Sequence, residues 1–138
     1  MATSATFASG MAPIRAKIPA AQTTNLVDIC DNSARLKAAR IEGLGIASDD
    51  SSACNIQFSI LSGGVSYPIS TVNVPASSGT NGTAARVNVL PSIGVLAPDG
   101  IYDLWIGAGE KLQANALVTL TSGKTATITG RVRLFEVA

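Results

Sequence analysis

Short segments in which apolar and polar residues alternate are the feature of this sequence that most constrains its fold. Ile56, Phe58 and Ile60 alternate with polar residues, and the same period of two recurs over residues 111–120 and 125–137. Alternation places successive side chains on opposite faces of a strand. Clusters of Gly, Ser, Asn, Asp and Pro separate these segments roughly every 8–12 residues. About eight strands without a long helix predict an all-β, antiparallel β-sandwich of jelly-roll type.

One segment, residues 34–47, is ambiguous because its leucines and Arg40 also suit one face of a helix. Gly43 and Gly45 each disfavour a helix by about 1 kcal/mol. A strand with a bend or bulge near these glycines is therefore expected. Further along, Pro68 interrupts an alternating segment, which indicates a strand at the edge of a sheet.

The start of the chain differs in composition from the rest. Residues 1–22 are rich in Ala, Ser and Thr and contain two prolines that disfavour helix. They are predicted to form an extended N-terminal arm, and residues 23–138 the β-sandwich domain. The alternating side chains of the arm, which are candidates for contact with a partner, are Ile14, Arg15, Lys17 and Ile18. The arm is expected either to lie across a neighbouring molecule as an added strand or to be a loose terminus.

Charge and aromatic content limit the classes of partner. Only 14% of the residues are charged, and ten basic against nine acidic residues leave a net charge of +1. This balance gives no general attraction to nucleic acid, and an aromatic content of 4% leaves few platforms for stacking bases. Because an isolated domain usually keeps more charge on its surface, this low share of charged residues predicts that part of the surface is covered by a partner.

Cys30 and Cys54 lie in apolar, strand-like segments and are expected to be buried thiols in a reducing cytoplasm. A disulfide between neighbouring strands is the alternative. Two cysteines without histidine do not build a usual zinc site, and no cofactor is expected. No apolar run reaches the length of a membrane span, and the N-terminus lacks a secretion signal. The sequence therefore predicts a protein that is made in the cytoplasm and does not enter a membrane.

The triplet Gly123-Lys124-Thr125 ends the phosphate-binding loop of many nucleotide hydrolases. That loop also requires a glycine at the position of Val118 and a helix after the lysine. The residues after Lys124 alternate like a strand, so nucleotide binding is not expected. Ser122 and Gly123 are instead predicted to form the turn of a hairpin that joins the last two strands.

Acid–base catalysis near neutral pH usually recruits histidine, and the chain has none. Carboxylate pairs remain, such as Asp99 with Asp103, but they stand in turns where Asp bonds to its own backbone. The sequence therefore predicts that the protein is not an enzyme. A small hydrolase of unusual chemistry that uses Asp99 or Asp103 is kept as a minor alternative.

Basic and aromatic residues of the later strands are candidates for contact with a partner protein. Arg131 and Arg133, together with Lys124, form a small basic stripe along the last strand. Trp105 alternates with Leu104 and Ile106, so one of these two sets must point away from the core. An outward set would form an exposed apolar patch of the kind that marks a contact surface.

The C-terminal segment GAGEKLQANALVTLTSGKTATITGRVRLFEV combines an alternating strand, a Gly turn and a threonine-rich last strand. Together with ARLKAARIEGLGIASDDSSACNIQFSIL earlier in the chain, it resembles small virion proteins of tailed bacteriophages. The family is the jelly-roll cement, or decoration, proteins of phage capsids, and the resemblance spans roughly residues 25–137. The motifs are general β signals, so no individual contact residue is carried over.

The resemblance implies a structural role on the outside of an icosahedral shell. Such a protein binds major capsid subunits as a dimer or trimer, bridges neighbouring subunits and stabilises the shell against packaged DNA, without contacting nucleic acid directly. The location is then the capsid surface of the virion. A phage tail or fibre module that binds carbohydrate is the alternative, although it requires a concave site with exposed aromatic residues.

Overall fold

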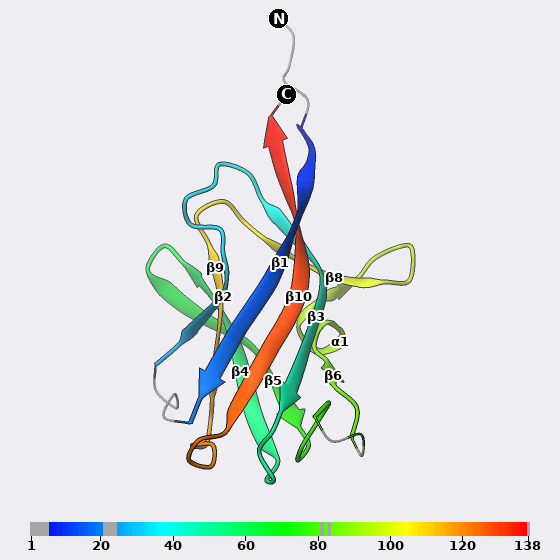
Figure 1. The fold of residues 1–138 in the computed structure, drawn as a ribbon. Coiled ribbons are helices and arrows are strands. Elements are labelled where there is room, and N and C mark those ends of the chain that lie inside the picture. The colour runs from blue at the N-terminus through cyan, green and yellow to red at the C-terminus, as the bar shows by residue number, and fades with distance from the viewer. Residues whose placement is uncertain (1–5, 21–24, 81, 83, 138) are drawn as a thin grey trace, which may run out of the picture.

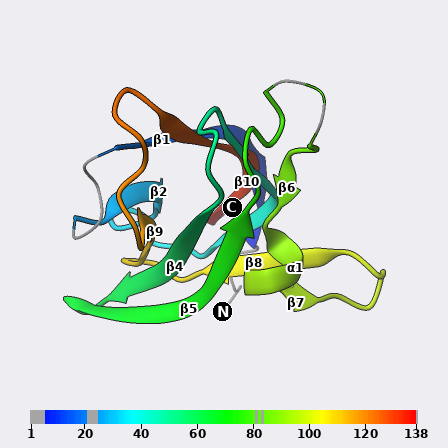
Figure 2. The ribbon, with the colours of Figure 1, turned by 90° about the horizontal axis from the view of Figure 1, so that it is seen from below.

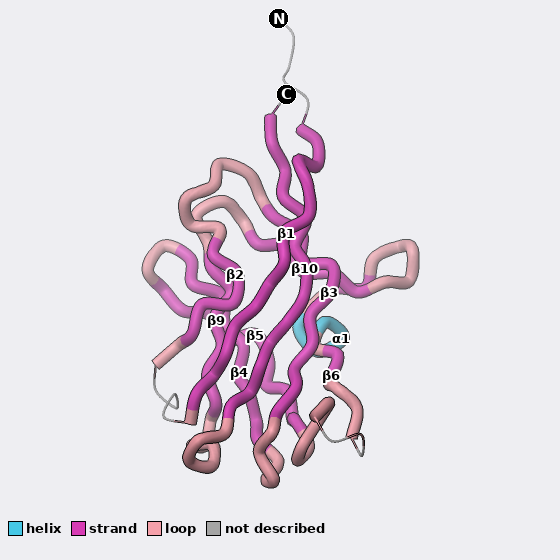
Figure 3. The backbone as a smooth tube through the Cα atoms, in the orientation of Figure 1, coloured by secondary structure: helices cyan, strands magenta, loops and turns pink. Residues whose placement is uncertain are grey.

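The structure is a computed structural model that describes residues 6–20, 25–80, 82 and 84–137. Nearly all regular structure in these residues is strand (Figure 3). The one described helix, α1 (Leu90–Ile93), is a single turn with a proline in its first turn, where the missing N–H has no helical partner to lose. The predicted all-β class is confirmed.

Two antiparallel sheets pack face to face (Figures 1 and 2). Sheet A has the strand order β1–β10–β3–β8–β7, and β6 also pairs with β3. Sheet B has the order β2–β9–β4–β5. The strands are β1 (Thr6–Pro19), β2 (Val27–Asp31), β3 (Ala39–Ser48), β4 (Cys54–Ser62), β5 (Val65–Val74), β6 (Val87–Asn88), β7 (Val95–Leu96), β8 (Tyr102–Ile106), β9 (Lys111–Ala116) and β10 (Thr125–Val137).

The strand order is that of a jelly roll. The two-residue strands β6 and β7 are additions, and the other eight strands form two sheets of four. Among these eight, the first pairs with the last, the second with the next to last and the third with the one before, while β4 and β5 form the closing hairpin. This nested pairing is a long antiparallel hairpin rolled into two sheets, which is the jelly-roll architecture. The predicted fold class is confirmed.

Strand β1 shows that the first part of the chain belongs to the sandwich. Its residues are extended, as predicted, but they pair with β10 along the whole length from Thr6 to Pro19. The side chains of Ile14 and Ile18 are 3% and 0% exposed and belong to the core. The strand packs because its alternation supplies one apolar face for the sheet. The predicted boundary between residues 22 and 23 lies outside the described residues.

The connection before β10 differs from the predicted hairpin. The turn itself is present, because Gly123 has φ of 78° and the Lys124 N–H donates to Thr121 O at 2.9 Å. However, β9 lies in sheet B and β10 in sheet A, so the connection crosses between the two sheets. The predicted hairpin is wrong because alternation indicates on which face of a strand each side chain lies, but it does not indicate which other strand pairs with it. The alternating pattern also continues beyond the end of β9. The strand ends at Ala116, and Val118, which follows it, is 66% exposed.

Two local predictions in the strands hold. The segment around Gly43 is strand β3, and its register with β10 shifts between Arg131 and Val132, opposite the predicted bulge. Pro68 lies in β5, which is an edge strand of sheet B. An edge position suits proline because its nitrogen donates no ladder hydrogen bond.

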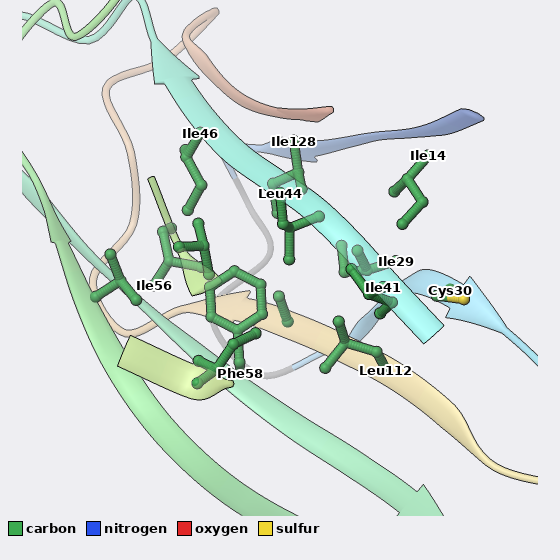
Figure 4. Packing of buried hydrophobic residues seen from close by; sticks show 14 of the residues in the cluster. Ile14, Ile29, Cys30, Ile41, Leu44, Ile46, Ile56, Phe58, Leu112 and Ile128 are labelled. Atoms are coloured by element: carbon green, nitrogen blue, oxygen red, sulfur yellow. The ribbon is translucent and has the colours of Figure 1, made fainter. Parts of the chain in front are cut away.

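The core lies between the two sheets (Figure 4). Ile41 and Ile128 from sheet A face Phe58 and Leu112 from sheet B, and all four are fully buried. Complete burial of a side chain of this size stabilises the fold by roughly 2–3 kcal/mol. Both cysteines are buried and free, so the disulfide alternative does not apply to this structure.

Candidate functional site: the outer face of sheet A

The outer face of sheet A, called face A from here on, carries six of the ten basic residues of the chain. Figure 1 shows the strands β1, β10 and β3 that carry it side by side in front. Alternation on each strand turns its apolar residues to the core and the others outward. The outward side chains used below are Met11, Arg15 and Lys17 on β1, Arg40 and Glu42 on β3, Asp103 and Trp105 on β8, Thr129, Arg131, Arg133 and Phe135 on β10, and Arg86 just before β6.

The charge on face A is unbalanced. Six basic residues lie on it, whereas only two acidic residues, Glu42 and Asp103, do so among the side chains that the structure describes. The chain as a whole carries +1, so this face is basic because the charges are distributed unevenly. A face of one charge sign steers a partner of the opposite sign and helps to set its orientation.

An ion-pair network joins three strands in the upper part of face A. Arg133 donates to Glu42 through Nε at 2.6 Å and through Nη2 at 3.1 Å, which makes a two-point pair. Arg40 lies 3.4 Å from the same carboxylate and donates through Nε to Asp103 Oδ2 at 2.7 Å. The network prevents Arg40 and Arg133, which are directly opposite in the β3–β10 register, from repelling each other.

The pKa of Glu42 is lowered below its ordinary value of 4.5, chiefly by the hydrogen bond from Arg133. The charges of Arg133, Arg40 and Arg131 act in the same direction, while burial opposes them. The same hydrogen bond raises the pKa of Arg133. Glu42 is therefore an ionised structural carboxylate at neutral pH, which is unsuited to act as a general acid.

An aromatic pair lies beside the network. Trp105 stacks on Phe135 with ring centroids 5.4 Å apart and an angle of 23° between the planes. Leu104 and Ile106 point into the core. Trp105 therefore points outward, and it is 51% exposed. Met11, 44% exposed, is opposite Arg133 on the neighbouring strand. Exposed Trp together with Arg is typical of the residues that dominate protein–protein affinity.

The structure brings five of the seven predicted contact residues together on face A: Arg15, Lys17, Trp105, Arg131 and Arg133. The other two, Ile14 and Ile18, lie in the core and are not available to a partner. Lys124, which the sequence grouped with the two arginines, precedes β10 at the far end of the strand.

Sequence reasoning missed the remaining members of face A. Arg40 and Glu42 lie in the segment whose helix or strand state was ambiguous, although their shared parity on a strand would have placed them together. No signal in the sequence would have placed Arg86, because it stands in a connection and reaches across the sheet through long-range pairing.

Asp99 and Asp103, the carboxylates considered for catalysis, make structural bonds, and so does Asp50. Asp99 Oδ1 accepts from the Ile101 N–H at 3.1 Å in a turn, and Asp103 is paired with Arg40. Asp50 accepts from the N–H and the hydroxyl of Thr121 at 2.7 and 2.8 Å, which ties two loops together. In the described part of the chain, no group of three or more His, Cys, Asp or Glu residues is arranged to hold a metal ion.

The outer face of sheet B, called face B from here on, is polar but largely uncharged. The polar side chains that its register places there are Asn55, Gln57, Ser59, Ser66, Thr71, Asn73, Gln113 and Asn115. Leu61 and Pro68 lie on the same face. Asn73 donates to Asn55 at 3.0 Å and Gln113 donates to Asp28 at 2.8 Å. The ion pairs of Lys111 with Asp28 and Asp31 lie at the β2 edge of this face.

No protein-family model and no curated protein matches the chain. Among solved structures, the chain is similar to a chain of the cyanophage Pam1 capsid asymmetric unit, with 12% identity, a TM-score of 0.44, and coverage of 96% of this chain and 86% of that chain. It is also similar to a chain of turnip yellow mosaic virus, with 9% identity, a TM-score of 0.42, and coverage of 99% and 96%. The jelly-roll assignment follows from the strand order of this chain and does not depend on these similarities.

No described helix is both long and apolar enough to cross a membrane.

Proposed function

We propose that the protein is a structural component of a virion that binds the outside of a bacteriophage capsid and cements neighbouring major capsid subunits. The observation that carries this proposal is face A, where an exposed stacked tryptophan adjoins six basic side chains on one rigid sheet. The resemblance of the sequence to phage cement proteins and the jelly-roll strand order support it. The protein then acts without catalysis, as a dimer or trimer at the capsid surface.

The ion-pair network of face A suits a binding surface. Arg40 and Arg133 are held by Glu42 and Asp103 in the free protein, so their side chains lose little freedom when a partner arrives. Trp105 and Phe135 offer a rigid apolar area beside them. Fixed aromatic and arginine side chains contribute to affinity because their ordering is already complete before binding.

Cementing requires only modest affinity at each contact. A molecule that bridges two subunits makes its second contact at a high effective concentration, so the overall affinity exceeds that of either contact. A protein that binds only the assembled shell also stabilises that shell by mass action. A chain with few charges and a partly apolar face is compatible with being covered in the assembly.

The proposal is tested by adding the purified protein to capsid shells that lack it. We expect regularly spaced density on the outer surface by electron microscopy, together with a higher temperature of shell disruption. Bovine serum albumin at the same concentration serves as the control for non-specific adsorption. Shells that stay bare and show unchanged heat resistance would refute the cement function.

Face B favours a second candidate, the carbohydrate-binding tail or fibre module. Its carboxamides and hydroxyls, including Gln57, Thr71 and Asn73, could bond to sugar hydroxyls. Against it, the stacked aromatic residues Trp105 and Phe135 lie on face A. The exposed Tyr67 of β5 is paired with Ile60, so the register places it on the opposite side of sheet B from these polar groups. Binding of defined glycans on an array, lost on substituting Gln57 and Thr71 by alanine, would establish this function instead.

A further inference from the structure

Face A holds a second group of cations, which combines three predicted contact residues with Arg86. Arg15 on β1 is directly opposite Thr129 on β10, and Thr129 is opposite Gly45 on β3. Arg131 follows on the same face of β10, and Lys17 follows Arg15 on β1. The side chain of Arg86, which precedes β6, also reaches Thr129. The basic cluster is defined as Arg15, Lys17, Arg86 and Arg131.

Arg86 reaches the cluster because β3 carries a glycine there. Its Nη2 donates to the Thr129 carbonyl oxygen at 2.9 Å, 43 residues away in the sequence. A Cβ atom added to Gly45 would overlap the Arg86 guanidinium. The guanidinium therefore lies flat across β3 in the space that the missing side chain leaves, and it adds a fixed positive charge beside Arg131.

The basic cluster forms no ion pair among the described side chains, although the charge of Arg131 acts on Glu42. The two acidic residues of face A, Glu42 and Asp103, are engaged by Arg133 and Arg40. Among the described side chains, no acidic group lies within ion-pair distance of the four cations. Neighbouring like charges on a sheet are destabilising. A partner that brings negative charge offsets this repulsion between the cations, and this contributes favourably to the free energy of binding.

A shallow hollow lies at the centre of the cluster. It has a volume of about 320 Å³ and is lined by Gly43, Gly130, Thr129, Arg86 and Arg131. Two of the lining residues are glycines, which have no side chain to fill the hollow, and two are arginines. Such a site admits a carboxylate side chain and offers it two guanidinium groups, the geometry that carboxylates bind best.

We propose that the basic cluster binds carboxylate side chains of an acidic protein surface, with Arg86 and Arg131 as the central donors. This rests on the proposed function, in which that surface belongs to the capsid shell. Protein carboxylates fit better than nucleic acid phosphates. Tight binding to nucleic acid commonly uses about 6–10 phosphate contacts, whereas this cluster has four cations, and the stacked pair of Trp105 and Phe135 beside it is typical of protein interfaces.

The first test compares two double variants with the same change in net charge. Arg15→Gln with Arg131→Gln removes two charges from the basic cluster, and Ser66→Glu with Thr71→Glu adds two negative charges to face B. For the cluster variant we expect the dissociation constant for shells lacking the protein to rise about tenfold or more, and for the face B variant to change less than about twofold. Both variants must show the wild-type thermal unfolding midpoint.

Salt gives the second readout. Wild-type binding is expected to weaken as sodium chloride is raised, and the cluster variant to show a flatter dependence because fewer ion pairs form. Equal affinity and equal salt dependence of the wild-type protein and the cluster variant would overturn the inference while leaving the cement function intact.

A third measurement does not need shells, so it separates failure of the inference from failure of the proposed function. The wild-type protein is titrated with poly-L-glutamate and, separately, with a short DNA duplex, and backbone amide shifts are followed by NMR. We expect poly-L-glutamate to shift Gly45, Thr129 and Arg131 first. Shifts confined to other regions, or a stronger response of these amides to DNA than to poly-L-glutamate at equal charge concentration, would overturn the carboxylate assignment.

Discussion

Faces A and B are built on the same alternating pattern but carry different chemistry. Face A holds six basic residues, an ion-pair network and a stacked tryptophan. Face B holds carboxamides and hydroxyls, with charge only at its β2 edge. Only face A combines an excess of basic side chains with an exposed, stacked aromatic pair. Under the proposed function, face A is the surface that meets the partner and face B is the surface left to solvent.

The backbones of the two sheets differ as well. The strands of sheet A contain Gly10, Gly43, Gly45 and Gly130, whereas the strands of sheet B contain no glycine. In sheet A, Gly130 allows a close approach of β10 to the backbone of β3, and Gly45 leaves room for Arg86. Glycine weakens a strand, so the two sheets differ in how much their backbones depend on missing side chains.

The largest expected effect concerns this close approach. A Cβ atom on Gly130 would collide with the carbonyl oxygen of Gly43, which is backbone and cannot move aside. Gly130→Ala should therefore lower the free energy of unfolding by about 3 kcal/mol, measured by urea denaturation. The reverse change in sheet B, Ala114→Gly, should lower it by only about 1 kcal/mol. Equal losses in both sheets would contradict the proposed backbone difference.

The next effect concerns binding. Trp105→Ala should weaken association with shells lacking the protein by about 2 kcal/mol, because an exposed Trp beside arginines is expected to anchor the interface. The free energy of unfolding should change little, since the side chain is half exposed. Tyr67→Ala, which removes an exposed aromatic ring from β5 of sheet B, is the matched control and should leave binding unchanged. Calorimetric titration measures both variants.

A smaller effect is expected from the ion-pair network. Glu42→Gln leaves Arg40 and Arg133 opposite each other without the carboxylate that both contact. The free energy of unfolding should fall by about 1–2 kcal/mol. Adding a charge to face B with Asn73→Asp should change it by less than about 0.5 kcal/mol, because that position is exposed. Wild-type stability of the Glu42 variant would show that the network contributes nothing to folding.

The smallest effect is the dependence of stability on pH. The folded protein lowers the pKa of Glu42 from 4.5 and that of Asp50 from 3.8, in the second case chiefly through the Thr121 N–H. Their stabilising contribution is therefore complete above these ordinary values and is lost as the pH falls below them. The urea midpoint should decline as the medium is acidified through this window. Glu42→Gln and Asp50→Asn should each make the decline shallower, and an unchanged slope would refute the assignment.

Much of the architecture could be predicted because strand alternation is a local property. The period of two placed Trp105 opposite Leu104 and Ile106, and it grouped Arg131 with Arg133 on one face. Turn residues such as Gly123 could also be predicted, because a backbone position with positive φ favours glycine in any tertiary context. The neighbours of each strand could not be predicted from this local pattern, which is why the predicted hairpin before β10 is wrong.

The sequence by itself determined the fold class and the face of each strand on which a side chain stands, because pleating depends only on the neighbouring residues of the same strand. Only the tertiary structure decided that β1 packs into sheet A, and that Arg133 meets Glu42 from 91 residues away. It also decided that Arg86 crosses Gly45 to reach Thr129. These contacts depend on which strands pair across long stretches of chain, and that pairing is set by burial of the whole core and not by any local pattern.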